Sequence, residues 1–378
     1  MLIIDGDYPM AFGAIELDRD LTRSIDEVRN ADPGVSGDPD WPDSETMATL
    51  PEMRRGRIAV ALVKVSGPIA RPGNPLSGHR SPENAYAAAQ AHIAYYRMLD
   101  VQGEARIIRT QGEFSDHMRI WLGATDYGQL PVGLIVGIEG ADPILDPRHV
   151  HDWWNDGVRV VSLSHYGVST YCHGTGTGTD GGLFEPAAEL LREMESLGMM
   201  LDLTHASDQS VREALDLFNG PVLASHQNCR AIVPGERQFP DKLLEAVIER
   251  GGVIGVSMDT WMLYKPGHRW GGPVESRRDL FPRDAVTLAD LADHADHICQ
   301  LSGNSLHAAI GGDTDGQHGR DGAPWEIDTV ADYQKFADVL RQRGYSQEDV
   351  ANIMYGNWQR FYATNLPTDP RNPSAQGY

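Results

Sequence analysis

Residues 199–226 read MMLDLTHASDQSVREALDLFNGPVLASH. This stretch contains two short apolar runs that each lead into a histidine, His205 and His226. The segment between them has the length of one helix and two turns, so the pattern predicts a strand, a helix and a second strand parallel to the first. Both histidines then emerge at the same edge of the sheet. Two neighbouring imidazoles suit a metal site, whereas either one alone is equally typical of a hydrogen-bonded histidine at a strand end.

The rest of the chain repeats this pattern of apolar runs and helix-compatible segments. Eight runs have the composition of buried parallel strands: 2–5, 57–65, 131–138, 157–163, 199–203, 221–224, 252–257 and 308–310. Eight such strands predict an α/β fold of the (β/α)8 or TIM-barrel type. Helix-like residues 330–343 and 348–362 predict additional C-terminal helices. Without an evident linker or internal repeat, residues 1–378 are expected to form a single domain.

Composition excludes several classes of partner. The formal net charge of −22 argues against binding to nucleic acid and to anionic membrane surfaces, because both would repel the chain. The three cysteines, Cys172, Cys229 and Cys299, are too scattered for a disulfide framework or a cysteine-type zinc site. The sequence begins without the features of a secretory signal, and no apolar run is long enough to span a bilayer. We therefore expect a soluble, cytoplasmic protein.

Polar side chains gather where the predicted strands end. Barrel enzymes carry their chemistry at the carboxyl ends of the strands, so this pattern predicts an active site there. The residues concerned are Asp7, Glu139, His165, His205, His226, Asp313 and Asp315.

Glu139, His205 and His226 form a set of two histidines and one carboxylate. Such a set fits a catalytic Zn²⁺ that keeps a position open for water. A bound zinc ion lowers the pKa of its water and polarises a carbonyl group. The sequence therefore predicts zinc as the cofactor.

Four further residues have candidate roles around this set. Asp313 is placed to accept a proton from the attacking water and to pass it to a leaving amine. His165 suits a donor to a developing oxyanion, and its neighbour Tyr166 is a candidate substrate contact. Arg237 could bind a substrate carboxylate through both of its terminal nitrogens, although a loop arginine more often forms a surface ion pair.

Longer motifs make the chain resemble the membrane (renal) dipeptidase family of zinc metallopeptidases, which are amidohydrolase-type barrels. The matching segments, in chain order, are IVGIEGAD, GVRVVSLSHYG, GGLFEPAAELLREMESLGMMLDLTHAS, PVLASHQNCRAI, ERGGVIGVSM, AIGGDTDG and NIMYGNWQRFY. The resemblance implies a metal-dependent hydrolase of dipeptides or similar small amides, and a homodimer. It also implies that Glu139, His205 and His226 bind metal, that His165 and Arg237 contact substrate, and that Asp313 shuttles a proton.

The first predicted strand departs from the family pattern. The family has a His-x-Asp motif there that completes a two-zinc centre, whereas this chain has Asp7 in place of the histidine and Pro9 in place of the aspartate. We therefore predict one zinc per chain, with Asp7 as an accessory ligand or a second acid–base group. The alternative is a two-metal centre that uses Asp7. The altered motif also leaves open a lyase, an isomerase, a hydrolase of a specialised metabolite, or a non-catalytic binding relative.

Several other polar residues have simpler interpretations. The His-Val-His-Asp segment at 149–152 does not follow a predicted strand and is interpreted as a surface feature. His294 and His297 are expected on the solvated face of a helix. Asp315 either supports the metal ligands or caps the following loop. The loops at 66–81, 174–182 and 261–278 are expected to line the pocket, and His173 is a candidate to enter it.

Overall fold

The computed structural model describes residues 1–31, 45–75, 77–178, 181–265, 282–315 and 319–369. Within these ranges the strands are β1 (Ile3–Tyr8), β2 (Ile58–Val65), β3 (Ala105–Ile107), β4 (Val132–Ile138), β5 (Val158–Ser162), β6 (Met200–Asp202), β7 (Val222–Leu223), β8 (Ile254–Ser257) and β9 (Ala308–Gly311). All of the strand pairs are parallel. The strands follow the order β1-β2-β4-β5-β6-β7, and β8 pairs with β9.

The strands close into a barrel around one axis. A parallel bridge between Ala224 and Ile254 joins β7 to β8. On the other side β9 packs against β1, where the Gly312 N–H donates to Asp5 Oδ1 over 2.7 Å and the Asp313 N–H donates to the Asp7 carbonyl. All eight predicted strands are therefore present, and the predicted barrel is confirmed. The extra strand β3 pairs with β4 outside this ring and was not predicted.

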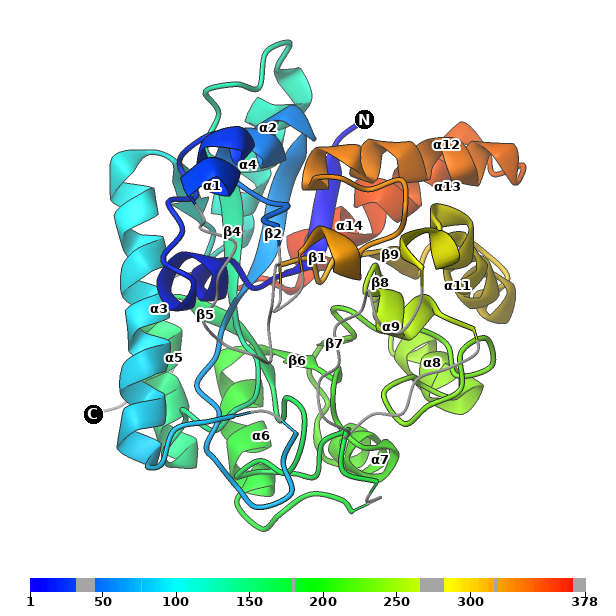
Figure 1. The fold of residues 1–378 in the computed structure, drawn as a ribbon. Coiled ribbons are helices and arrows are strands. Elements are labelled where there is room, and N and C mark those ends of the chain that lie inside the picture. Colours follow the sequence, from blue (N-terminus) through cyan, green and yellow to red (C-terminus); the bar gives the residue numbers. More distant parts are fainter. Residues whose placement is uncertain (32–44, 76, 179–180, 266–281, 316–318, 370–378) are drawn as a thin grey trace.

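Helices surround the strands, as Figure 1 shows. The helices are α1 (Ile25–Ala31), α2 (Leu50–Arg55), α3 (Pro82–Gln102), α4 (Gln111–Gly123), α5 (Val150–Asp156), α6 (Ala187–Leu197), α7 (Asp208–Leu217), α8 (Asp241–Glu249), α9 (Thr260–Leu263), α11 (Leu288–Ser302), α12 (Gln334–Gln342), α13 (Gln347–Ala351) and α14 (Asn357–Asn365). The last three are the expected C-terminal helices. No described helix is long and apolar enough to cross a membrane.

Side-chain caps fix several helix starts. Ser81 accepts a hydrogen bond from the backbone of Asn84 at the start of α3, and Ser207 accepts one from the Ser210 N–H at the start of α7. Helix α1 begins only at Ile25. The reason is local, because Asp18 adopts a left-handed backbone (φ 53°) and Asp20 accepts a hydrogen bond from the Thr22 N–H.

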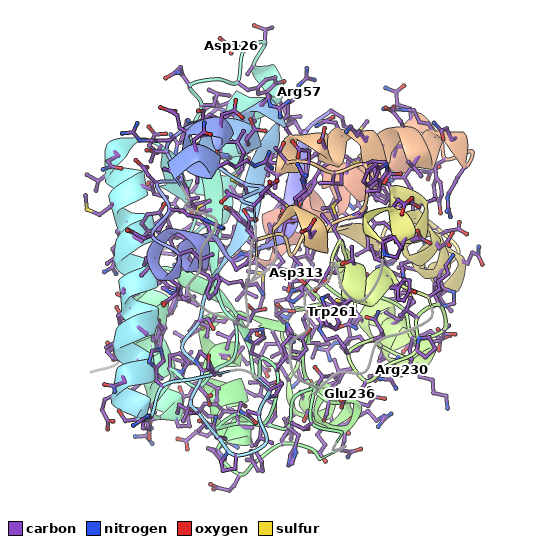
Figure 2. The ribbon with its side chains drawn as sticks, viewed as in Figure 1. Arg57, Asp126, Arg230, Glu236, Trp261 and Asp313 are labelled. Carbon is purple, nitrogen blue, oxygen red and sulfur yellow. The ribbon has the colours of Figure 1, made fainter. Side chains whose placement is uncertain are left out.

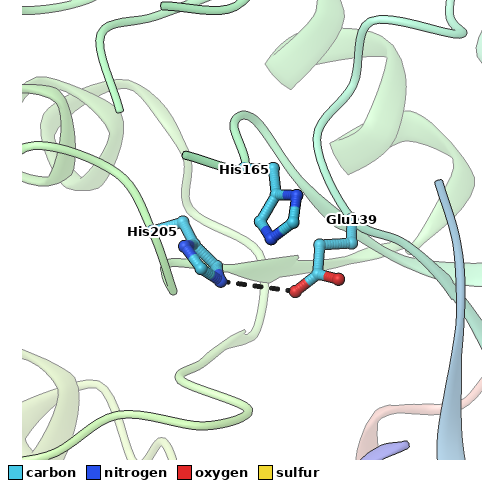
Figure 3. Close-up of side chains that lie close together, drawn as sticks. All are labelled: Glu139, His165 and His205. Carbon is cyan, nitrogen blue, oxygen red and sulfur yellow. Dashed lines mark ion pairs between the residues drawn. The ribbon is translucent and has the colours of Figure 1, made fainter. Parts of the chain in front are cut away.

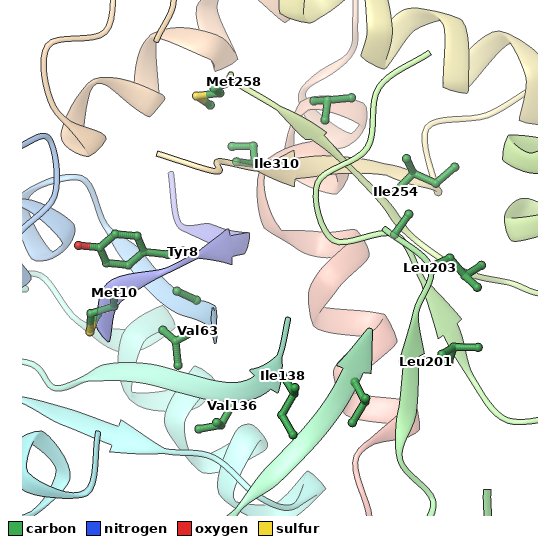
Figure 4. Packing of buried hydrophobic residues seen from close by; sticks show 14 of the residues in the cluster. Tyr8, Met10, Val63, Val136, Ile138, Leu201, Leu203, Ile254, Met258 and Ile310 are labelled. Atoms are coloured by element: carbon green, nitrogen blue, oxygen red, sulfur yellow. The ribbon is translucent and has the colours of Figure 1, made fainter. Parts of the chain in front are cut away.

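Two apolar clusters divide the faces of each strand. Side chains such as Val63, Ile138 and Leu201 pack with the surrounding helices in one large cluster, part of which is drawn in Figure 4. Alternate residues, such as Val60 and Leu62, form a second cluster that joins the strands to α4 and α14. Because side chains alternate between the two faces of a strand, this second cluster is the barrel interior.

Toward the carboxyl ends of the strands, the residues that face the barrel interior are polar. Lys64 follows Val60 and Leu62 on the same face of β2, and Asp202 follows Met200 on β6. Gly255 and Gly311 belong to this region, where a methyl group on either residue would overlap with the Ser225 carbonyl oxygen. The strands thus approach closely, and a buried polar layer lies between the apolar interior and the ends of the strands.

Candidate metal centre

Most of the predicted site residues lie at or just beyond the carboxyl end of a strand. Glu139 directly follows β4, His205 and His226 follow β6 and β7, Asp313 follows β9, and Asp7 lies near the end of β1. Figure 2 shows Asp313 near the middle of the molecule, whereas Arg57, which precedes β2, lies toward its margin. The parallel order of the strands therefore brings residues from distant parts of the sequence to one place.

Glu139, His205 and His226 converge on one point. The Nε2 atoms of the two histidines are 2.9 Å apart. Glu139 Oε1 is 3.4 Å from His205 Nε2 and 3.5 Å from His226 Nε2. Two ligands on one tetrahedral zinc ion, each about 2.0–2.1 Å from it, are about 3.3 Å apart. The three atoms therefore fit a single ion of this kind.

The outer nitrogen of His226 supports the same interpretation. His226 Nδ1 lies 3.1 Å from Asp7 Oδ1 and 2.9 Å from Ser225 Oγ. A hydrogen bond from Nδ1–H to the carboxylate leaves the Nε2 lone pair free for a cation, an arrangement typical of metal-binding histidines. His205 Nδ1 is buried and has no hydrogen-bond partner in the described part of the chain.

The ionisation of Glu139 and His205 suits metal binding, whereas for His226 burial would lower the pKa but the charges of Asp7 and Asp313 raise it. Burial alone would raise the pKa of Glu139, but His165, Lys64 and other cationic groups lower it to about 2. Burial holds the pKa of His205 well below its ordinary value, and the Arg237 charge adds to this effect. A carboxylate and a neutral imidazole are the forms that bind a metal ion.

His165 lies beside this set (Figure 3). Its ring meets the His205 ring edge-on at 4.5 Å, and the ligand atoms of Glu139, His165 and His205 lie within 4.8 Å of one another. Its Nδ1 is buried without a hydrogen-bond partner among the described residues. His165 is thus close enough to be a further ligand as well as the oxyanion donor that the sequence predicts.

Asp313 and Asp7 form the opposite side of the site. Asp7, His226 and Asp313 make a second group whose ligand atoms lie within 4.8 Å. Asp313 Oδ2 accepts a hydrogen bond from Ser257 Oγ over 3.2 Å. Its enclosed position and the charges of Asp7 and Asp259 raise the pKa of Asp313 to about 7, although His226 opposes the shift. A carboxyl group with this pKa can both accept and release a proton near neutrality.

The backbone is strained at two of these residues. His205 (φ 69°) and Asp313 (φ 55°) both adopt the left-handed conformation, which is costly for residues other than glycine. Such strain persists only where the surrounding structure enforces it, and it gathers at functional sites. Here it accompanies the turn that brings each side chain into the site.

Arg237 and Tyr166 lie against the same ligands. Arg237 is 1% exposed, and it donates to the His226 carbonyl and to Gln227 Oε1, both over 2.9 Å. Its guanidinium carbon is 5.9 Å from the centre of the Tyr166 ring, and that ring meets His205 at 4.5 Å. The Arg237 Nε is buried without a partner in the described structure. The sequence alternative of a surface ion pair is therefore wrong.

Sequence reasoning missed Lys64. Its Nζ is 2.8 Å from Asp7 Oδ1, 3.0 Å from Asp202 Oδ2 and 3.1 Å from Ser225 Oγ. Burial alone would lower the pKa of Lys64, but Asp202 and Asp7 raise it well above its ordinary value, so the side chain is an ammonium ion. The signal was a single lysine in the apolar strand RIAVALVKV.

The structure also places four other polar residues. The Asp315 carboxylate accepts hydrogen bonds from the backbone N–H groups of Met47 and Ala48, and the loop that it was expected to cap, 316–318, lies outside the described residues. His294 is buried, not solvated, and its Nδ1 accepts from the Cys229 N–H. His151 pairs with Glu193 away from the site, as expected of a surface feature. Asp202 is buried and accepts hydrogen bonds from the Thr204 and Ser225 N–H groups.

The loop predictions stay predictions. Most of the segment 261–278 and parts of 66–81 and 174–182 lie outside the described residues. His173 stacks near Phe184 at 4.9 Å and interacts through its backbone with Ser207.

The profile of the membrane dipeptidase family, peptidase family M19, matches residues 44–367. The chain belongs to this family. A dipeptidase of Aspergillus oryzae, aclJ, is 29% identical over 230 residues, which are 60% of this chain and 50% of that protein. Mouse dipeptidase 3 is 29% identical over 236 residues, which are 60% of this chain and 43% of that protein. The family member described here thus spans about half the length of the curated relatives it matches.

Solved structures show the same fold. A metallopeptidase of Rhodobacter sphaeroides, liganded with a phosphinate mimic of the dipeptide L-Ala-D-Ala, superposes with a TM-score of 0.73 at 20% identity, covering 97% of this chain and 99% of that chain. The probable dipeptidase PvdM of Pseudomonas aeruginosa gives a TM-score of 0.72 at 19% identity, covering 98% of this chain and 96% of that chain. The similarity extends over the whole barrel.

Proposed function

We propose that this protein is a metal-dependent hydrolase that cleaves the amide bond of a dipeptide or a dipeptide-like small molecule. The observation that carries the proposal is the convergence of Glu139 Oε1, His205 Nε2 and His226 Nε2 to within 2.9–3.5 Å of one another. These three residues would hold one zinc ion per chain, as their donor types and spacing suit it. When bound, zinc supplies an acidified water and a polarised substrate carbonyl.

The chain's own residues would do the rest of the chemistry. Asp313, with a pKa near 7, would take a proton from the attacking water and deliver it to the leaving amine. His165, with its unpartnered buried nitrogen, would donate to the developing oxyanion. Arg237 would bind a substrate carboxylate, and Tyr166 would pack beside it.

The substrate proposal draws on the family and on the site. Family membership and the dipeptide mimic bound by the Rhodobacter sphaeroides protein both favour a small dipeptide-like substrate. The buried cation of Arg237 favours a free carboxylate on that substrate. Because Asp7 and Pro9 replace the family motif, a second function is also proposed. In it, a related metal centre catalyses a lyase or isomerase reaction or acts on a specialised metabolite.

The proposal also covers the domain organisation, the localisation and the oligomeric state of the protein. We propose that residues 1–378 act as one catalytic domain, and that the protein is cytoplasmic, since its three cysteines are all buried and unpaired. We also propose a homodimer, on the family resemblance alone. Light scattering after size-exclusion chromatography tests the dimer.

Metal analysis and product analysis test the function together. We expect purified protein from zinc-replete medium to carry about one zinc per chain, with anomalous scattering at the zinc edge between Glu139, His205 and His226. A panel of dipeptides should release free amino acids, with oxygen from labelled water in the new carboxylate. Turnover without that label would favour the lyase or isomerase. Zinc-free protein that is indifferent to added metal, or ligand binding without turnover, would contradict the proposal.

A further inference from the structure

Lys64 holds a fixed positive charge next to the proposed metal ligands. Its side chain is 2% exposed and lies on the interior face of β2. An ammonium group has three N–H donors, and three oxygens surround this one, on Asp7, Asp202 and Ser225, at 2.8–3.1 Å. The charge is therefore held at one point in the barrel and is not free to follow a substrate.

Asp7 connects this ammonium group to the metal ligands. The same oxygen, Asp7 Oδ1, lies 2.8 Å from Lys64 Nζ and 3.1 Å from His226 Nδ1. Asp7 also belongs, with His226 and Asp313, to the second group of potential ligands. By residue type this second group could hold a cation of its own. In this structure the Asp7 carboxylate is already paired with a cation, the Lys64 ammonium group.

We propose that the Lys64 ammonium takes the place of a second metal ion at Asp7, so that the centre combines one metal ion with one built-in organic cation. The inference rests on the proposed function, because it assumes the metal held by Glu139, His205 and His226. A zinc ion on Asp7 Oδ1 would lie about 2.0–2.2 Å from that oxygen. It would then face an ammonium group across a buried space, where like charges repel strongly.

Lys64 is accordingly a positioning residue. By holding Asp7, it fixes the acceptor for His226 Nδ1–H and so keeps the His226 Nε2 lone pair directed at Glu139 and His205. It also balances the charges of Asp7 and Asp202, which are 1% exposed and each have an oxygen within 3.0 Å of the Lys64 Nζ. The Lys64 ammonium therefore orders the metal position at Glu139, His205 and His226 and excludes a metal ion from Asp7.

Counting bound zinc tests this proposal. We expect calorimetric titration of the metal-free full-length protein with zinc to reveal one site, and Lys64→Ala to reveal a second, so that bound zinc rises from about one to about two per chain. Ethylammonium should fill the space left in Lys64→Ala, displace the second zinc and raise the melting temperature. Lys335→Ala, which removes a surface lysine that pairs with Asp332, is the matched control and should keep one zinc.

Each result decides the matter. Two zinc ions in the wild-type protein, or a Lys64→Ala chain that stays at one zinc and ignores ethylammonium, would overturn the inference while leaving the metal centre intact. If Lys64→Ala does not fold, Asp7→Asn replaces it, and loss of a whole zinc ion from that variant would identify Asp7 as a true ligand and overturn the inference. A wild-type count of zero overturns the proposed function itself.

Discussion

At the amino ends of the strands, His117 and Arg159 are buried and their nitrogens bond to backbone carbonyls. His117 Nε2 donates to Ala59, and the Arg159 guanidinium donates to Arg109, Trp154 and Val158 while it stacks on the Trp154 ring. At the carboxyl ends, His165, His205 and Arg237 each keep a buried nitrogen without a partner in the described structure, and Asp7 keeps such an oxygen.

This difference separates stability from function. Buried polar atoms are normally satisfied, because leaving one unpaired costs free energy. At the amino end, His117 and Arg159 follow that rule and stabilise the barrel, although Trp154 Nε1 and the Tyr362 hydroxyl there are buried without a partner in the described structure. The carboxyl end departs from it at four side chains around one site, where a substrate or ordered water would complete the bonding. Substitutions at the carboxyl end should therefore impair activity, and substitutions at the amino end should impair stability.

The largest effect is expected from His205→Ala. Removing one of three ligands should abolish zinc binding and lower kcat/KM by on the order of a thousandfold or more, since the activated water is lost. Metal analysis and steady-state kinetics measure this. His297→Ala is the matched control, because His297 lies on α11 and pairs with Asp241 at the start of α8 and not with a residue of the site. Equal activity of the two variants would contradict the assignment of His205.

Asp313→Asn should act on the chemical step alone. Loss of the proton acceptor is expected to lower kcat by about a hundredfold to ten-thousandfold, with zinc content and melting temperature close to those of the wild type. Kinetics and metal analysis on the same preparation separate the two roles. Loss of zinc from this variant would show that Asp313 is a ligand and not a proton shuttle.

Arg159→Met tests the amino end. The substitution keeps an apolar side chain over Trp154 but leaves backbone carbonyls of Arg109, Trp154 and Val158 without their donor. We expect the free energy of unfolding to fall by about 3 kcal/mol, measured by urea denaturation, with kcat/KM of the folded protein unchanged. A clear loss of activity at unchanged stability would break the distinction between the two ends.

The smallest effect concerns pH. Burial lowers the pKa of His117 from 6.5 to about 4, so between these values the unfolded chain binds more protons than the folded one. The contribution of neutral His117 to the free energy of unfolding is therefore fully present above pH 6.5 and is lost as the pH falls toward 4. From pH 6.5 to pH 5, the free energy of unfolding should decrease by about 1.5 kcal/mol through this residue. His117→Gln keeps a donor for the Ala59 carbonyl and should flatten this part of the profile; an unchanged profile would contradict the assignment.

Much of the barrel could be predicted from the sequence because strands buried on both faces are nearly continuous apolar runs. The same reasoning placed Glu139, His205, His226 and Asp313 at strand ends. It failed for β3, which is only three residues long and lies outside the ring. It also failed for His294, because the spacing of two histidines on a helix does not reveal which of them meets a backbone N–H from another segment.

The sequence by itself determined the fold, the family and the types of side chain at the strand ends. Only the tertiary structure decided which of these side chains meet, because contacts such as Asp7 with His226 and Lys64 with Asp202 join strands that are far apart in the chain. The alternation of β2 turned Lys64 into the barrel, but its three acceptors come from β1, β6 and the residue Ser225 beyond β7. Apolar periodicity is a local property of the chain, whereas the pairing of buried charges depends on how the barrel closes.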